Sequence, residues 1–120
     1  LCTARIFDLT RPDARWDYVR MRLTGIQLYI DGINKARPEE LKKLAAVAAA
    51  NALKVSVECG GTLGFAPLDD RNGESSARIE LAKLDKWRRA GGRIDYLNLD
   101  GPVRRLLYPR RGKKRIAGFT

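Results

Sequence analysis

Three segments of the chain alternate apolar and polar residues in the way expected of strands with one buried face. They are residues 26–31, 55–58 and 93–100. Between them, apolar residues recur every three or four positions, which predicts helices. One such stripe follows Pro38 and comprises Leu41, Leu44, Ala45 and Ala48. The other follows a cap at Ser75 or Ser76, comprises Ile79, Ala82, Leu84 and Trp87, and is closed by Gly91-Gly92.

The N-terminal part predicts one further strand and one further helix. Residues 1–7 read as a short strand. Thr10 can cap a helix in which Pro12 occupies the first turn, and apolar residues from Trp16 to Leu23 then recur at helical spacing. Gly25 is expected to end that helix before the next strand begins.

The resulting order, β-α-β-α-β-α-β, predicts an α/β fold with four parallel strands joined by right-handed crossovers. We expect one domain over residues 1–120, with a basic C-terminal segment from about residue 101 that has no clear period. Such a unit corresponds to half of a TIM barrel, either a natural half-barrel or a piece of a longer chain. Its unpaired edges and uncovered sheet face favour association, and two copies could close an eight-stranded barrel as a homodimer.

The polar positions of the alternating segments all fall on one face, because successive side chains of a strand point to opposite sides. Each segment also ends in an acid on that face, namely Asp31, Glu58 and Asp100. Ligands of parallel α/β folds bind beyond the carboxyl ends of the strands, so these three acids are the candidate catalytic residues. The alternative is that the acids cap loops and that the polar face is solvated.

The same face supplies candidate substrate-binding residues, which are Gln27, Tyr29, Tyr96 and Asn98. Gly60 and Gly61 follow Glu58 and would let a ligand approach the backbone closely, although a tight strand exit explains them equally well. The tyrosines could stack on a sugar or serve as packing groups. Cys59 has the opposite parity from Glu58 and is expected to lie inert beneath a helix.

Residues 26–31, 55–61 and 94–102 resemble the second, third and fourth strand-and-loop units of the xylose-isomerase-like TIM barrels. This superfamily includes sugar isomerases and epimerases, apurinic endonucleases and proteins described as glycosyl hydrolases. The resemblance implies a small sugar substrate and a divalent metal held by strand-end residues. It carries over to Glu58 and Asp100 as metal or sugar-hydroxyl ligands, whereas the histidines that family members use are missing here.

Composition limits the possible partners, metal sites and location of the protein. The chain has 120 residues, of which 44% are apolar and 32% charged, and it has no apolar run long enough to span a bilayer. We therefore expect no membrane partner, and any targeting segment is expected to be absent or already removed. Two cysteines and no histidine exclude the usual zinc spacings and favour reduced thiols, with the cytoplasm as the default location. A Cys2–Cys59 disulfide would require export.

The net charge of +10 raises nucleic acid as a second possible partner. Seven of the basic residues crowd the segment 104–115, where they could neutralise phosphates. Packing residues interrupt that segment, and an acidic rim would repel a polyanion, so a solvated basic loop is the simpler interpretation. Two functions fit the pattern of strand-end acids, namely glycoside cleavage by two carboxylates and metal-assisted sugar isomerisation. The unpaired sheet edges suggest a third possibility, assembly without catalysis.

Overall fold

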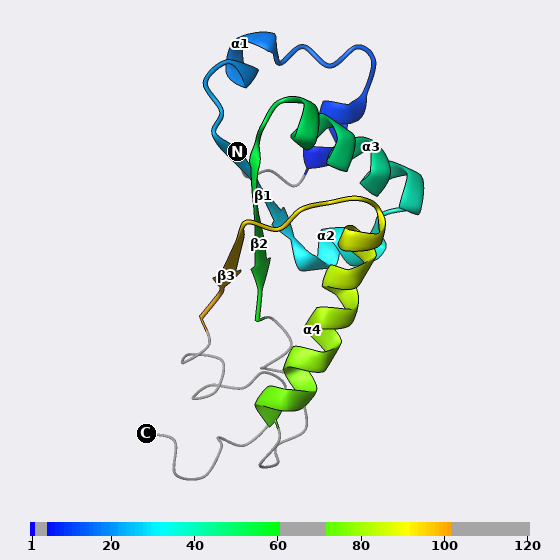
Figure 1. Ribbon diagram of the computed structural model, residues 1–120, viewed down its shortest axis with the longest axis vertical. Coiled ribbons are helices and arrows are strands. Elements are labelled where there is room, and N and C mark those ends of the chain that lie inside the picture. The colour runs from blue at the N-terminus through cyan, green and yellow to red at the C-terminus, as the bar shows by residue number, and fades with distance from the viewer. Residues whose placement is uncertain (2–4, 61–71, 102–120) are drawn as a thin grey trace.

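The computed structural model describes residues 1, 5–60 and 72–101, which form a mixed α/β fold around a parallel sheet of three strands (Figure 1). The strands are β1 (Gly25–Tyr29), β2 (Lys54–Cys59) and β3 (Tyr96–Leu99), and they lie in the order β1-β2-β3. The helices are α1 (Asp17–Arg20), α2 (Ile30–Lys35), α3 (Pro38–Ala50) and α4 (Asn72–Arg89), preceded by the 3-10 helix η1 (Ile6–Thr10).

The register of the sheet confirms the two-faced pattern of the strands. Ile26 pairs with Val55 and Leu28 with Val57, and all four side chains are buried. The intervening positions, such as Gln27 opposite Ser56, are polar. Because residues that pair across a parallel sheet point to the same side, the apolar side chains form one face and the polar side chains the other.

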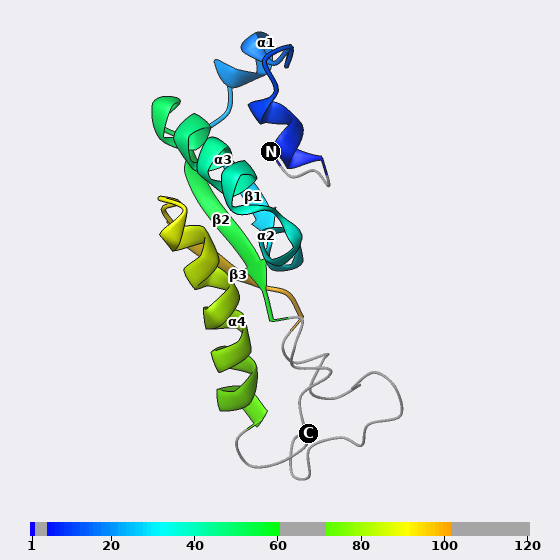
Figure 2. The ribbon, with the colours of Figure 1, turned by 90° about the vertical axis from the view of Figure 1, so that its right-hand side faces the viewer.

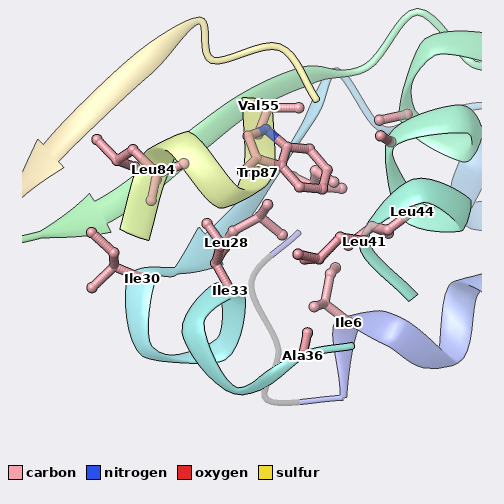
Figure 3. Packing of buried hydrophobic residues seen from close by; sticks show 14 of the residues in the cluster. Ile6, Leu28, Ile30, Ile33, Ala36, Leu41, Leu44, Val55, Leu84 and Trp87 are labelled. Atoms are coloured by element: carbon pink, nitrogen blue, oxygen red, sulfur yellow. The ribbon is translucent and has the colours of Figure 1, made fainter. Parts of the chain in front are cut away.

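Helices α2, α3 and α4 all lie on the apolar face of the sheet (Figures 1 and 2). The core between the layers draws residues from every one of these elements and from η1 (Figure 3). Its largest fully buried side chains are Trp87, Leu28, Ile33, Leu41, Leu44, Val55 and Val57. Right-handed crossovers between neighbouring strands place each helix on the same side, which explains this arrangement.

The prediction for α3 is confirmed in its start and in its buried face. The helix begins at Pro38, and Leu41, Leu44, Ala45 and Ala48 are the residues that it buries. Its first turn is closed by Glu40, whose carboxylate accepts a hydrogen bond of 2.9 Å from the backbone N–H of Arg37. Proline at the first helical position and an acid in the first turn both favour a helix start.

The prediction for α4 is correct at its C-terminal end and wrong at its N-terminal end. Leu84 and Trp87 are buried, but Ile79 and Ala82 are exposed, and the helix begins at Asn72 instead of at a serine cap. Ser76 and Glu80 take the inward positions, about two turns and one turn before Leu84. The N-terminal turns of α4 extend beyond the ends of the strands (Figures 1 and 2), so apolar spacing there does not report contact with the sheet.

The predicted N-terminal helix is wrong, and the predicted strand over residues 1–7 does not extend to Ile6. Residues 6–10 form η1, and α1 covers four residues of the segment between Thr10 and Gly25 in which the helix was expected. Thr10 does not cap a helix, because its hydroxyl donates to the carbonyl of Phe7 at 2.8 Å. The backbone of Arg11 is extended, as expected of a residue that precedes proline, and this separates η1 from α1.

A trace of the fourth strand is present at Leu1. Its amino group donates to the carbonyl of Gly25, and its carbonyl accepts from the N–H of Gln27, both at 2.8 Å. This is the hydrogen-bond pattern of one parallel bridge to Ile26. Residues 2–4 lie outside the described part of the chain, as does the basic segment after residue 101, so three strands are described where four were expected. Across the described ranges, no helix combines the length and the apolar character needed to cross a membrane.

Candidate functional site

The polar face of the sheet carries seven side chains from three strands. They are Gln27 and Tyr29 on β1, Lys54, Ser56 and Glu58 on β2, and Tyr96 and Asn98 on β3. The register places them directly opposite one another, with Tyr29 beside Glu58 and Glu58 beside Asn98. Four of the seven, Gln27, Tyr29, Tyr96 and Asn98, are among the predicted substrate-binding residues, and Glu58 is a predicted catalytic acid. The structure therefore brings these five residues together on one surface.

Glu58 is held by a hydrogen bond across the sheet. The amide Nε2 of Gln27 donates to Oε2 of Glu58 at 2.9 Å, and the contact is partly buried. This bond fixes which end of the Gln27 amide faces the carboxylate, and it leaves the amide oxygen available to accept a hydrogen bond. The pair therefore offers an acceptor from each residue and a second N–H of Gln27 as a donor.

Among the residues that the structure describes, none covers this face with a helix or strand. Tyr29, Tyr96 and Asn98 are exposed, whereas Gln27 and Glu58 are half-buried. The helices that cover the sheet all lie on its other side (Figure 2). A ligand could thus approach the half-buried pair between the two exposed aromatic rings.

A hollow of about 420 Å³ lies at the amino end of the polar face. Its lining includes the predicted residues Gln27 and Tyr96 together with Thr24, Lys54 and Ser56. A volume of this order suits a small polar molecule. The parity of β2 already placed Ser56 on this face, and Lys54 has the same parity but lies one residue before the predicted strand. No periodic signal marks Thr24, which directly precedes β1.

Asp31 does not lie on this face, and its predicted position at a strand end is wrong. The strand β1 ends at Tyr29, and Asp31 falls in the first turn of α2. Its carboxylate lies 3.2 Å from Nζ of Lys83 on α4, on the helical side of the sheet. An acid in a first helical turn is favoured by the helix dipole, which accounts for its position without a role in a strand-end rim.

Glu58 and Asp100 lie on neighbouring strands near their carboxyl ends, as predicted. Glu58 is the penultimate residue of β2, and Asp100 directly follows β3. The backbone N–H of Asp100 donates to the carbonyl of Cys59 at 2.9 Å, which holds the end of β3 against β2. Among the residues that the structure describes, no group of three or more His, Cys, Asp or Glu side chains is placed to hold a metal. A metal at Glu58 and Asp100 would need further ligands from outside these residues.

Gly60 is required by the backbone at the exit of β2. Its φ is +96°, and a Cβ there would lie 3.6 Å from both the nitrogen and the carbonyl oxygen of Asp100. Gly60 is also buried, which favours the tight strand exit over a role in ligand approach. Gly61 lies outside the described residues. Cys59 is buried as predicted, and this burial raises the pKa of its thiol, which keeps the group protonated and unreactive.

Sequence reasoning assigned no role to Asp95, which anchors the start of β3. One carboxylate oxygen accepts the backbone N–H of Val55 at 2.9 Å, and the other lies 2.8 Å from the guanidinium of Arg93 and 3.4 Å from Nζ of Lys54. The hydrogen bond from Val55, assisted by Arg93, lowers the pKa of Asp95 below its ordinary value of 3.8. The carboxylate thereby joins the beginnings of β2 and β3 and closes the amino end of the sheet.

Replacing Asp95 with asparagine should destabilise the fold in a pH-dependent way. Because the folded-state pKa is depressed, the carboxylate stabilises the fold fully above about pH 4, and this contribution is lost as the pH falls through the lower folded-state value. The gap in unfolding free energy between wild type and Asp95→Asn should therefore be constant near neutral pH and shrink in acid. Urea unfolding from about pH 7 to about pH 2.5 would measure it. The control is Asp13→Asn, an exposed acid paired with Arg11, which should change stability little at neutral pH.

Comparison with protein-family models, with curated proteins and with solved structures gave no match.

Proposed function

We propose that this protein is carbohydrate-active and has a partial TIM-barrel-type fold, with the polar face of the sheet as its sugar-binding surface. The observation that carries the proposal is the Gln27–Glu58 pair, half-buried in a face that is otherwise lined by tyrosine, serine, asparagine and lysine side chains. Vicinal sugar hydroxyls are both donors and acceptors, and carboxylate and amide groups held side by side can bind them in both senses. The exposed rings of Tyr29 and Tyr96 could stack on the apolar side of a sugar ring.

The strand order supports the barrel interpretation. Consecutive strands are neighbours, and the helices α2 to α4 lie on one face. A sheet that continued in the same sense would curl with its helices outside and its polar face inside. The four-stranded half-barrel belongs to this proposal, and if further parallel strands closed the barrel, the polar face would be the wall of an enclosed sugar site.

Two chemistries suit the acids at the carboxyl end. Glycoside cleavage requires two carboxylates on opposite sides of the scissile bond, and Glu58 and Asp100 are the pair on neighbouring strands. In a sugar isomerase, the same two acids would hold a divalent metal that polarises the sugar carbonyl. Asp31 is not part of either arrangement, because its carboxylate is paired with Lys83 on the helical side.

The described residues do not favour nucleic acid as the partner. The segment 104–115, on which that function rests, lies outside them. Several cations of α4 and Arg37, which precedes α3, are paired with nearby acids, which is typical of a solvated surface. These pairs are Arg37–Glu40, Arg78–Glu74, Lys83–Asp31 and Arg89–Asp85.

Titration with simple sugars tests the proposal. We expect a panel that includes D-xylose, D-glucose and D-fructose at about 10 mM to shift the amide resonances of β1 and β2, with at least one sugar bound at millimolar affinity or better. Glu58→Gln keeps the shape of the side chain and an acceptor for Gln27, but it removes the charge. Since hydrogen bonds to charged groups contribute about 1.5–3 kcal/mol, affinity should fall by roughly tenfold or more.

Glu39→Gln is the matched control for this experiment. It removes the same charge from an exposed position in the first turn of α3, away from the polar face, and should leave sugar affinity unchanged. If no sugar of the panel perturbs strand resonances, or if both variants behave alike, the sugar-binding proposal is wrong.

A further inference from the structure

The outer edge of β3 borders an unusually apolar surface. Leu97 and Leu99 on β3 are 54% and 60% exposed, and Leu81 on α4 is 61% exposed. Leu81 and Leu97 also line a groove of about 450 Å³ between α4 and β3, together with Leu84, Ile94, Asp85 and Arg88. Leu97 and Leu99 are in register with the buried residues Val57 and Cys59, so they lie on the helix-covered side of the sheet, where apolar side chains are normally shielded.

The backbone of β3 is also open on this side. Within the described ranges, β3 is paired on one side with β2 and on the other side with no strand. The N–H of Asp100 donates inward to Cys59, and backbone groups alternate in direction along a strand. The N–H and carbonyl groups of Leu97 and Leu99 therefore point outward, toward the open edge, which is a template for another strand.

We propose that this edge is a homodimer interface, in which β3 of one copy pairs antiparallel with β3 of a second copy about a two-fold axis at Asn98. In this register Leu97 faces Leu99 of the partner subunit as a hydrogen-bonded pair, and the reciprocal pair is identical. The outward backbone groups of both leucines are satisfied, and the two three-stranded sheets become one continuous sheet.

The occupant is a second copy because the edge is complementary to itself. When two copies of a strand pair antiparallel about a two-fold axis that passes through one residue, side chains from the same face of the strand lie opposite one another. All four exposed leucines of β3 and its symmetry mate then cluster on the helix side, between the two α4 helices. The polar face continues across the junction, where Tyr96 and Asn98 extend toward their symmetry mates.

The charges at the rim of the groove fit the same arrangement. Asp85 and Arg88 of α4 both line the groove, and the Asp85 carboxylate lies 3.8 Å from the Arg88 guanidinium. A rim that carries both signs can meet its own copy without a net like-charge contact, whereas a uniformly basic or acidic rim could not. The interface does not depend on sugar binding and is tested without any sugar.

Sedimentation equilibrium of the full chain tests the proposal. Wild type should sediment with twice the mass of one chain at micromolar concentration. Leu97→Lys combined with Leu99→Lys places charges at the edge, and should raise the concentration at which half the protein is dimeric by about tenfold or more. Both side chains are exposed in the single chain, so its far-ultraviolet circular dichroism should be unchanged. Met21→Lys, at an exposed apolar residue near α1, is the control and should leave the dimer intact.

Cross-linking reports the register independently. Asn98 should face its symmetry mate across a non-hydrogen-bonded pair, for which Cα atoms lie about 4.5 Å apart, within the range of a disulfide. Asn98→Cys in a Cys2→Ser background should therefore form a covalent dimer on mild oxidation, whereas Tyr18→Cys in the same background should not. A monomeric wild type overturns the proposal. A dimer also overturns it if the two lysine substitutions do not weaken that dimer and Asn98→Cys does not cross-link it.

Discussion

Replacing Trp87 with alanine is expected to lower the free energy of unfolding by about 3–5 kcal/mol, the range for a fully buried aromatic side chain. Trp87 is 0% exposed and is the largest side chain in the core. It packs between α4 and the sheet beside Val55 (Figure 3). Its indole Nε1 also donates to the carbonyl of Arg93 at 2.9 Å, so the same substitution leaves that carbonyl without this partner. Loss of both interactions would loosen α4 from β2 and the entry into β3.

Urea unfolding followed by circular dichroism measures this effect. Trp87→Phe should retain most of the packing but lose the indole donor, and it should fall between wild type and Trp87→Ala. Tyr18→Ala is the control, because Tyr18 is 67% exposed and interacts with Arg22 through a guanidinium 4.2 Å from its ring centroid. Such an exposed contact contributes about 0.5–1 kcal/mol. A loss at Trp87 no larger than that at Tyr18 would contradict the packing described here.

The sequence predicted those segments in which a single hydrophobic period runs between residues that clearly start and stop the element. Strands β1 and β2 alternate strictly, and α3 runs from Pro38 with a continuous apolar stripe, so both their type and their buried face were predicted correctly. The parallel arrangement followed from the order of elements. In these segments local propensity and tertiary packing favour the same structure.

The errors arose where packing, and not local period, decides the structure. The apolar spacing of Ile79 and Ala82 predicts a buried stripe, but Ser76 and Glu80 take the inward positions of α4, whose N-terminal turns extend past the strands. Asp31 continues the alternation of β1 two residues past Tyr29, where the chain has turned into α2. A period shows which residues share a face, but it does not show where the partner layer ends.

The candidate site shows the same limit. The alternation of the strands placed Gln27 and Glu58 on one face. The hydrogen bond between these two residues, which are 31 positions apart, depends on the register between β1 and β2. Asp95 gave no signal at all, because an acid near a strand start is common in turns. The side chains of the site were therefore predictable as a set, whereas their pairing was not.

Gly91 and Gly92 are together predicted to be a helix stop, but the structure gives them different roles. Gly91 has a φ of +86°, which favours glycine, and a Cβ there would meet nothing within 4 Å. Gly92 has no such backbone requirement. A Cβ at Gly92 would lie 2.0 Å from Cε2 of Trp87, well inside any real contact distance. Gly92 is thus a packing residue, which allows the chain to cross the face of the indole.

Gly92→Ala should accordingly lower the free energy of unfolding by about 1–3 kcal/mol or more, because the added methyl group must displace the indole or the backbone. Gly73→Ala is the matched control. It makes the same change within α4 where nothing lies within 4 Å, and it should stabilise the fold by up to about 1 kcal/mol. Equal effects of the two substitutions would rule out steric contact at Gly92.

A double-mutant cycle identifies the indole as the group that excludes a side chain at Gly92. In a Trp87→Leu background the smaller side chain vacates the position of the indole ring, so Gly92→Ala should cost less there than in wild type. For residues in direct contact the coupling is about 0.5–3 kcal/mol. An unchanged cost would mean that the backbone around Gly92, and not the ring of Trp87, resists the methyl group. The close approach of chain and indole would then contribute nothing to the docking of α4 on the sheet.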